Sequence, residues 1–373
     1  MIRVGPLLLS ICLILSSCHK KRVEGFLAVP VTALSIKAQT IPANFEYVGV
    51  GKSSHIVELR ARVEGYLESI DYQEGALVQT GAPMFVVDQR PFIAALDMAK
   101  GELMRQKALL WNAQQIKNRM VPLYQEDAVS QKDLDDAIAN ELAAEANVAT
   151  AEAHVQKAEI NLSYTSIQSP VTGMASFAKF REGALISPGP DSLLTDIYVI
   201  DPIWVYFSVS MGDILQARTE TANGSLVMPK NNDFDIEIVF SNQTTLPATG
   251  KIDFASPSLQ QSTGTMFVRA VASNPQGWLK PGEFVKVIVK GAFRPNAIIV
   301  PQTAVMQGMN GTFVYVVDKE SKALMRPVTL GDWYKDYWIV QSGLKSGDVV
   351  ITQGVNKVEN GTLVAIQSWA KGT

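Results

Sequence analysis

The chain has 373 residues, of which 47% are hydrophobic and 18% are charged, so it has enough apolar material for several small cores. Its formal net charge is −3, and the lack of a basic surplus argues against a nucleic-acid partner. Its 2 cysteines, Cys12 and Cys18, both lie near the N-terminus, so the rest of the chain must be held together by packing without disulfides.

The N-terminus resembles a bacterial export signal. Arg3 precedes a mostly apolar run over residues 4–15, which is too short to span a bilayer and is typical of a signal peptide. Leu15-Ser16-Ser17-Cys18 forms a lipobox, so we predict a signal peptide over 1–17 and lipidation of Cys18. The alternative is an ordinary signal peptide that is cleaved elsewhere.

Residues 18–28 are then a lipidated tether that anchors an exported protein to a membrane. His19 follows the cysteine and does not by itself decide between the inner and outer membranes. We expect a periplasmic protein held at the inner membrane. Strand-like apolar positions follow over 29–46, and a further strand is predicted over 47–61.

A short stretch of the chain occurs twice. The first copy runs from Val63 to Leu67 and from Glu74 to Val78; the second runs from Val171 to Ala175 and from Glu182 to Ile186. In both copies the second glycine follows the first by ten residues and lies in Glu-Gly-Ala-Leu-Val/Ile. Two matched β halves predict one small sandwich, and the absence of a Met-Lys-Met or Asp-Lys-Ala sequence argues against the alternative of a biotin or lipoate carrier.

The residues between the two copies have a helical pattern. Pro91 suits the first turn of a helix, and Ala, Leu, Gln, Lys and Glu recur at spacings of three and four over 91–162. The pattern predicts an antiparallel coiled-coil hairpin with a narrow, alanine-rich seam, whose arms of about 35 residues would extend roughly 50 Å. Its remaining apolar stripe would meet neighbouring copies or a partner; the alternative is that it folds back onto the rest of the chain.

The C-terminal half is rich in strand patterns. We predict strands at 203–209, 234–240, 248–255, 265–273 and 283–290, and later at 298–300, 312–317, 328–330, 338–340 and 349–352. Asn310-Gly311 and Asn360-Gly361 are typical of hairpin turns. The fold class is therefore mainly β with one long α-helical hairpin.

Few residues offer catalytic chemistry. Gly49 to Ser53 end like a phosphate-binding loop, but Glu46 stands where that loop needs a glycine. The histidines, His19, His55 and His154, are scattered without metal-ligand spacing. We therefore expect no enzyme, no cofactor and no metal site.

The predicted hairpin tip carries a family resemblance. Arg119, Leu123 and Ser130 have the spacing of the Arg–Leu–Ser tip motif of periplasmic adaptors, the membrane fusion proteins of RND tripartite multidrug efflux pumps in the HlyD-like superfamily. The stretches that also resemble this family are 161–173, 279–285, 295–302 and 343–350, so the resemblance covers essentially the whole mature chain. Two departures are Pro122, which should loosen the last turn of the first arm, and Gln260, where an acidic residue is common.

The resemblance implies an elongated, nested fold of four domains. They are a membrane-proximal β domain (29–46 and 295–368), a β-barrel (47–61 and 201–294), a lipoyl-like sandwich (62–90 and 163–200) and the α-hairpin (91–162). The protein would bridge an inner-membrane RND transporter and an outer-membrane channel as a homo-oligomeric ring, a hexamer in the pump. Arg119, Leu123 and Ser130 would contact the channel, and Ser130 would also cap the returning helix with Asp133. An MFS, ABC or type I secretion exporter is the alternative partner.

Overall fold

The computed structural model describes residues 28–309 and 311–370. The predicted signal peptide, Cys18 and almost all of the predicted tether lie outside these described residues. The chain forms two compact units. The first contains the residues up to Ala43, Arg218–Met228 and the residues from Ala292 onward, and the second contains Asn44–Ala217 and Pro229–Gly291.

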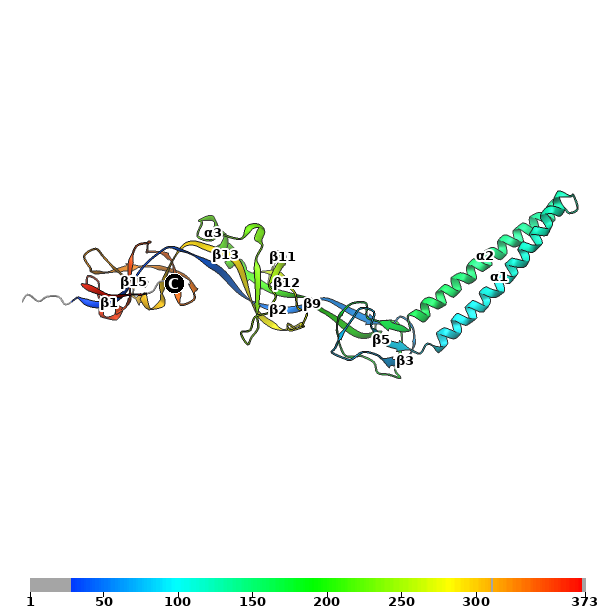
Figure 1. Cartoon of the computed structure of the whole chain (residues 1–373), viewed down its shortest axis with the longest axis horizontal. Coiled ribbons are helices and arrows are strands. Elements are labelled where there is room, and N and C mark those ends of the chain that lie inside the picture. Colours follow the sequence, from blue (N-terminus) through cyan, green and yellow to red (C-terminus); the bar gives the residue numbers. More distant parts are fainter. Residues whose placement is uncertain (1–27, 310, 371–373) are drawn as a thin grey trace, which may run out of the picture. The chain divides into compact units, whose positions relative to one another are not determined.

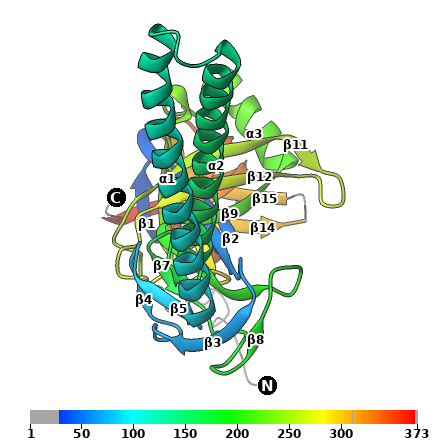
Figure 2. The same cartoon turned by 90° about the vertical axis from the view of Figure 1, so that its right-hand side faces the viewer.

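The predicted helical hairpin is confirmed in the second unit. Helix α1 (Arg90–Gln125) and helix α2 (Gln131–Ser163) run antiparallel side by side (Figures 1 and 2). Pro91 lies in the first turn of α1, where its missing N–H costs no helical hydrogen bond. The buried seam is narrow and partly made of alanine, as expected; its members are Leu96, Ala137, Val148 and Ala151.

Two ion pairs cross this seam. Lys117 Nζ lies 2.5 Å from a Glu141 carboxylate oxygen, and Lys107 Nζ lies 3.0 Å from one of Glu152. The first pair is the less exposed, because only 17% of the Glu141 side chain is accessible. Interhelical pairs of this kind favour the orientation in which the two helices meet.

Both copies of the sequence repeat fold into one small β module. Its strands are β3 (Gly65–Ile70), β4 (Leu77–Val78), β5 (Pro83–Val87), β6 (Ser166–Gln168), β7 (Gly173–Ala175) and β8 (Leu185–Ile186). Four of them form a sheet in the order β6-β5-β3-β8, while β4 and β7 continue onto β9. The core includes the fully buried Leu67, Met84, Phe85, Ile186, Leu194 and Ile197.

The remaining strands of the second unit belong to a larger sheet. They are β2 (Gln39–Arg60), β9 (Leu193–Ser210), β10 (Asp235–Val239), β11 (Gly250–Gln260), β12 (Thr265–Ala272) and β13 (Phe284–Pro301), of which β2 and β13 continue into the first unit. The predicted strands between 203 and 290 are confirmed. Ile203, Val205 and Phe207 alternate into the core, as period-two strands require. Gly49 to Ser53 lie within β2 and pair with β9.

Helix α3 (Met211–Ala222) was not predicted from the sequence. It follows β9 directly, and the Ser210 hydroxyl accepts a hydrogen bond of 3.0 Å from the Asp213 N–H. This contact satisfies one of the free donors at the start of the helix.

The first unit is built on β1 (Val29–Ser35), which pairs antiparallel with β19 (Val349–Gln353) and parallel with β20 (Val364–Trp369). Its other strands are β14 (Val305–Gly308), β15 (Gly311–Val317), β16 (Ala323–Pro327), β17 (Thr329–Tyr334) and β18 (Tyr337–Ser342). The described residues also contain three short 3₁₀ helices. One lies in the second unit, η1 (Lys230–Asn232), and two lie in the first, η2 (Gln302–Ala304) and η3 (Val355–Lys357).

The two Asn-Gly pairs have different outcomes. Strands β14 and β15 pair antiparallel around the first, although Asn310 itself lies outside the described residues. The second prediction is wrong. Asn360-Gly361 makes a turn before β20, but β19 and β20 flank β1 and do not form a hairpin with each other. The Asn360 side chain instead accepts a hydrogen bond from the Met325 N–H, and the Gly361 N–H donates to the Ala323 carbonyl.

Candidate functional site: the hairpin tip and the module that presents it

The tip is a tight connection between two long helices. Helix α1 continues through Pro122 to Gln125, and the Glu126 N–H donates to the Pro122 carbonyl at 3.2 Å. A proline inside a helix removes one backbone donor and crowds the carbonyl four residues earlier, yet α1 keeps its last turn here, so the expected loosening at Pro122 does not end the helix. Asp127 has a φ of 54°, a left-handed conformation that aspartate tolerates, and it turns the chain toward α2.

Arg119 and Leu123 are exposed near the end of α1. They are four residues apart and therefore lie on the same face, one turn from each other. Among residues 28–309 and 311–370, none accepts a hydrogen bond from the Arg119 guanidinium, so its five N–H donors remain available. The Leu123 side chain is 40% exposed.

Ser130 is the N-cap of α2, and this part of its predicted role is confirmed. The Asp133 N–H donates to the Ser130 hydroxyl at 3.3 Å, and the Ser130 N–H donates to the Asp133 carboxylate at 3.2 Å. The Ser130 hydroxyl also donates to that carboxylate at 2.6 Å. These bonds, the hydroxyl first, hold the pKa of Asp133 below its ordinary value.

The three predicted contact residues therefore share one short segment. Arg119, Leu123 and Ser130 all lie in the stretch that ends α1 and begins α2, and all three are exposed. The Ser130 hydroxyl proton is used in the hydrogen bond to the Asp133 carboxylate. The hydroxyl oxygen keeps the capacity to accept a further hydrogen bond.

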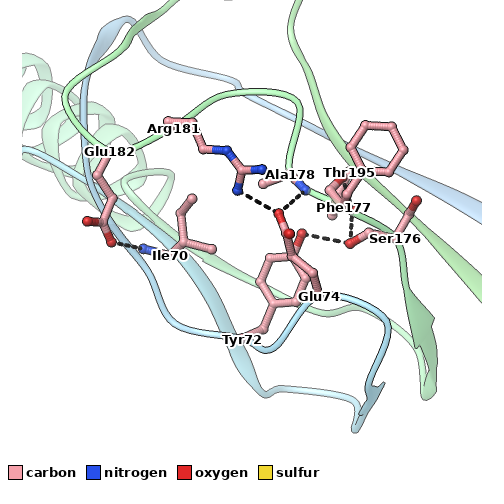
Figure 3. A network of polar contacts seen from close by, with 9 residues as sticks. All are labelled: Ile70, Tyr72, Glu74, Ser176, Phe177, Ala178, Arg181, Glu182 and Thr195. Carbon is pink, nitrogen blue, oxygen red and sulfur yellow. Dashed lines mark hydrogen bonds and ion pairs between the residues drawn. The ribbon is translucent and has the colours of Figure 1, made fainter.

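The β module that carries the hairpin is held by reciprocal contacts between the two repeat copies. The Glu74 carboxylate accepts a hydrogen bond from the Ala178 N–H at 2.8 Å, and the Glu182 carboxylate accepts one from the Ile70 N–H at 3.2 Å (Figure 3). In each case the glutamate before the second glycine of one copy binds the residue five positions after the first glycine of the other.

The backbone repeats this exchange. The Gly75 N–H donates to the Ala175 carbonyl at 2.9 Å, and the Gly183 N–H donates to the Leu67 carbonyl at 2.8 Å. Gly75 and Gly183 have φ values of 77° and 83°, which favour glycine over residues with a side chain. The two copies are thus related by an approximate two-fold arrangement.

One contact breaks this symmetry. Arg181 donates to the Glu74 carboxylate at 2.8 Å, and with the Ala178 N–H it lowers the pKa of that carboxyl, the N–H having the larger effect. Tyr72 donates to the Ser176 carbonyl at 2.9 Å and packs edge-on against Phe85, with ring centroids 5.3 Å apart. Burial raises the pKa of Tyr72. Sequence reasoning found the repeated glutamates but did not assign them this role.

The hairpin enters and leaves the module through paired strands. Strand β5 precedes α1, strand β6 follows α2, and the two pair antiparallel, with Val86 opposite Ser166. The Val87 N–H also donates to the Thr165 carbonyl at 2.9 Å. The paired strands bring the start of α1 and the end of α2 to one edge of the module.

The described part of the chain contains no candidate for a membrane-spanning helix or for a group of metal ligands. None of its helices combines the length and apolar character needed to cross a membrane. Within residues 28–309 and 311–370, no three His, Cys, Asp or Glu side chains are grouped as metal ligands.

Three domain descriptions match the sequence. The alpha-helical hairpin domain of RND MFPs matches residues 95–165, their beta-barrel domain matches 202–292, and their C-terminal permuted SH3 domain matches 296–357. The chain is 32% identical over 364 residues to the multidrug efflux pump subunit AcrA of Escherichia coli K12, covering 97% of this chain and 91% of that protein.

Two further comparisons agree with these matches. The chain is 35% identical over 332 residues to the efflux pump periplasmic linker BepD of Brucella suis biovar 1, covering 89% of this chain and 84% of that protein. The crystal structure of MacA from Actinobacillus actinomycetemcomitans has a TM-score of 0.62 at 22% identity, covering 86% of this chain and 98% of that chain. This last likeness concerns the fold.

Proposed function

Because the chain belongs to the RND-type membrane fusion proteins, the periplasmic adaptor family, we propose that it links an inner-membrane RND transporter to an outer-membrane channel for the efflux of drugs or other small molecules. The observation that carries this function is the likeness to efflux-pump subunits over nearly the whole chain, hairpin included. The RND-specific domain matches favour a proton-driven RND transporter over an MFS, ABC or type I secretion partner.

The hairpin tip is the proposed contact with the channel. Arg119 has free donors for carbonyl or carboxylate oxygens, and Leu123 exposes an apolar side chain one turn away. Ser130 caps α2 and can accept one more hydrogen bond. A charged, an apolar and a polar group on one tip would recognise a helical end of the channel.

We assign attachment to the membrane to the N-terminus of the chain. Lipidation of Cys18 would anchor the protein to the inner membrane, with residues 18–28 as a tether. We further propose that several copies, six in the pump, assemble into a ring around the substrate path. The protein is then an adaptor without catalytic residues, cofactor or metal.

We also propose a division of this adaptor into four domains. We assign 29–46 and 295–368 to the membrane-proximal domain, and 47–61 and 201–294 to the β-barrel. Residues 62–90 and 163–200 form the lipoyl-like module, and 91–162 form the hairpin. The reciprocal bonds of Glu74 and Glu182 favour treating the two module segments as one domain.

In-cell crosslinking tests the function at both ends. A photo-crosslinking amino acid would replace Leu123 at the tip, and in a second variant Met325, which is 49% exposed in the first unit. Mass spectrometry should identify an outer-membrane channel from the tip and an RND transporter from position 325. Replacement of Met104, 68% exposed in the middle of α1, is the control for proximity along the hairpin shaft. An MFS or ABC transporter at position 325 would refute the RND assignment, and no envelope protein at either end would refute the adaptor function.

A further inference from the structure

The second unit contains an open cavity that the adaptor function does not use. Its volume is about 480 Å³, within the range of roughly 300–1,000 Å³ that is usual for small-molecule sites. It lies between the end of β2 with the residues after it, 57–62, and the segment from the end of α2 to just beyond β6, 163–170. One wall therefore includes the end of α2, and the other belongs to the end of β2 and the residues that lead into the β module.

The lining combines four apolar residues with seven polar or charged ones. Val57, Leu59, Ile167 and Pro170 contribute apolar surface, and Leu59 is only 7% exposed. Tyr164 adds an aromatic ring beside them. Such a surface accepts the hydrocarbon or aromatic body of a ligand.

The charges at the cavity do not cancel. Arg60 donates through Nε and Nη2 to Glu58, and through Nη1 to the Pro190 carbonyl, so these two side chains neutralise each other. Arg62 lies over the Tyr164 ring, with its guanidinium carbon 5.2 Å from the ring centroid. Among the residues that the structure describes, none accepts a hydrogen bond from Arg62, so one positive charge faces the cavity with free donors.

The combination of these apolar side chains with one uncompensated guanidinium indicates the class of ligand. We propose that this cavity binds an amphipathic organic anion, with its apolar body on Val57, Leu59 and Ile167 and its carboxylate, sulfonate or phosphate on Arg62. The stacking of Arg62 on Tyr164 orients the guanidinium before binding, which reduces the cost of ordering it. This inference does not depend on the proposed adaptor function.

Two dyes with the same aromatic body test the proposal. 1-Anilinonaphthalene-8-sulfonate carries a sulfonate, and N-phenyl-1-naphthylamine is its neutral analogue. Fluorescence titration of the purified full-length protein should give tighter binding of the sulfonate. Arg62→Gln should raise the Kd of the sulfonate by about tenfold, the effect of one charge-assisted hydrogen bond, and leave the neutral dye unchanged.

Two further variants locate the site. Arg105→Gln removes an arginine that is paired with Glu102 on the hairpin, away from the cavity lining, and should change neither dye. Ser166→Trp places a large side chain on an exposed lining position and should abolish binding of the sulfonate while circular dichroism stays unchanged. Equal affinity for the two dyes, or sulfonate binding that survives both Arg62→Gln and Ser166→Trp, would overturn the proposal.

Discussion

Gly173 is a position where one added methyl group should push strand β7 away from strand β9 in the β module. An ideal Cβ at this residue would lie 2.6 Å from the Tyr198 carbonyl oxygen and 2.9 Å from its carbon. Ordinary contact begins at 3.4 Å, so β7 must move away from β9 by the difference between 3.4 and 2.6 Å, about 0.8 Å. The obstacle is backbone and cannot rotate aside. We expect Gly173→Ala to cost about 3 kcal/mol, the upper end of the usual range for overpacking.

Hydrogen exchange measures this loss where it occurs, since a chain with several domains does not unfold in one step. The Ser176 N–H, which donates to the Asp196 carbonyl at 2.8 Å, reports the join between the strands. A cost of about 3 kcal/mol should lower its protection on the order of a hundredfold. Protection within threefold of the parent would refute the argument from close approach.

Two other glycines give matched comparisons. Gly65 is the equivalent of Gly173 in the first copy, but its Cβ would meet a Val87 methyl group at 2.6 Å, so Gly65→Ala should cost less because a side chain can adjust. Gly101 lies inside α1 with nothing within 4 Å of a Cβ. Gly101→Ala should therefore stabilise the hairpin by about 0.5–1 kcal/mol, the opposite sign.

Four further predictions concern the tip and the anchor. Arg119→Asp should abolish drug resistance without lowering expression, because it places a carboxylate at the proposed channel contact; unchanged susceptibility would refute that contact. Ser130→Ala should destabilise the start of α2 by about 1 kcal/mol, whereas Ser130→Asn keeps the cap, and hydrogen exchange at α2 separates them. The folded-state pKa of Asp133 is lowered, so its cap bonds are complete above the ordinary carboxyl pKa and disappear as pH falls through the lowered value; an NMR titration with an ordinary midpoint would contradict this. Cys18→Ala should release the protein from membranes in cells that lack the partners, and fractionation that still finds it bound would contradict lipidation.

The hairpin was predictable because its signals are local. The helical pattern over 91–162 needs only spacings of three and four, and the structure has helices at Arg90–Gln125 and Gln131–Ser163. Pro91 and the Ser130–Asp133 box mark the two helix starts within one turn. Helix α3 also has a local signal, Ser210 followed by Asp213, but Gly212 and threonines weaken its helical propensity.

The rest depends on residues that meet only in the folded chain. Glu74 and Ala178 are 104 residues apart, and Glu182 and Ile70 are 112 apart, so the repeat predicted two matched halves but not their reciprocal bonds. Strand β20 pairs in parallel with β1, from the other end of the chain, and no nearby turn encodes that choice. The proposed channel contacts were suggested by the family resemblance, since an exposed arginine alone indicates little.

The reciprocal bonds explain how a small β module tolerates a long insertion. The two repeat copies bind each other directly, so the length of the connection affects the module only through the entropy of closing a loop, which rises slowly. Strands β5 and β6 are already antiparallel neighbours, as in a β-hairpin. We therefore expect a variant in which a short Gly-Ser turn replaces residues 90–163 to retain a folded module, with protected Gly75 and Gly183 amides in hydrogen exchange. If those amides lost their protection, the module would depend on the helices, and the hairpin would be part of its fold.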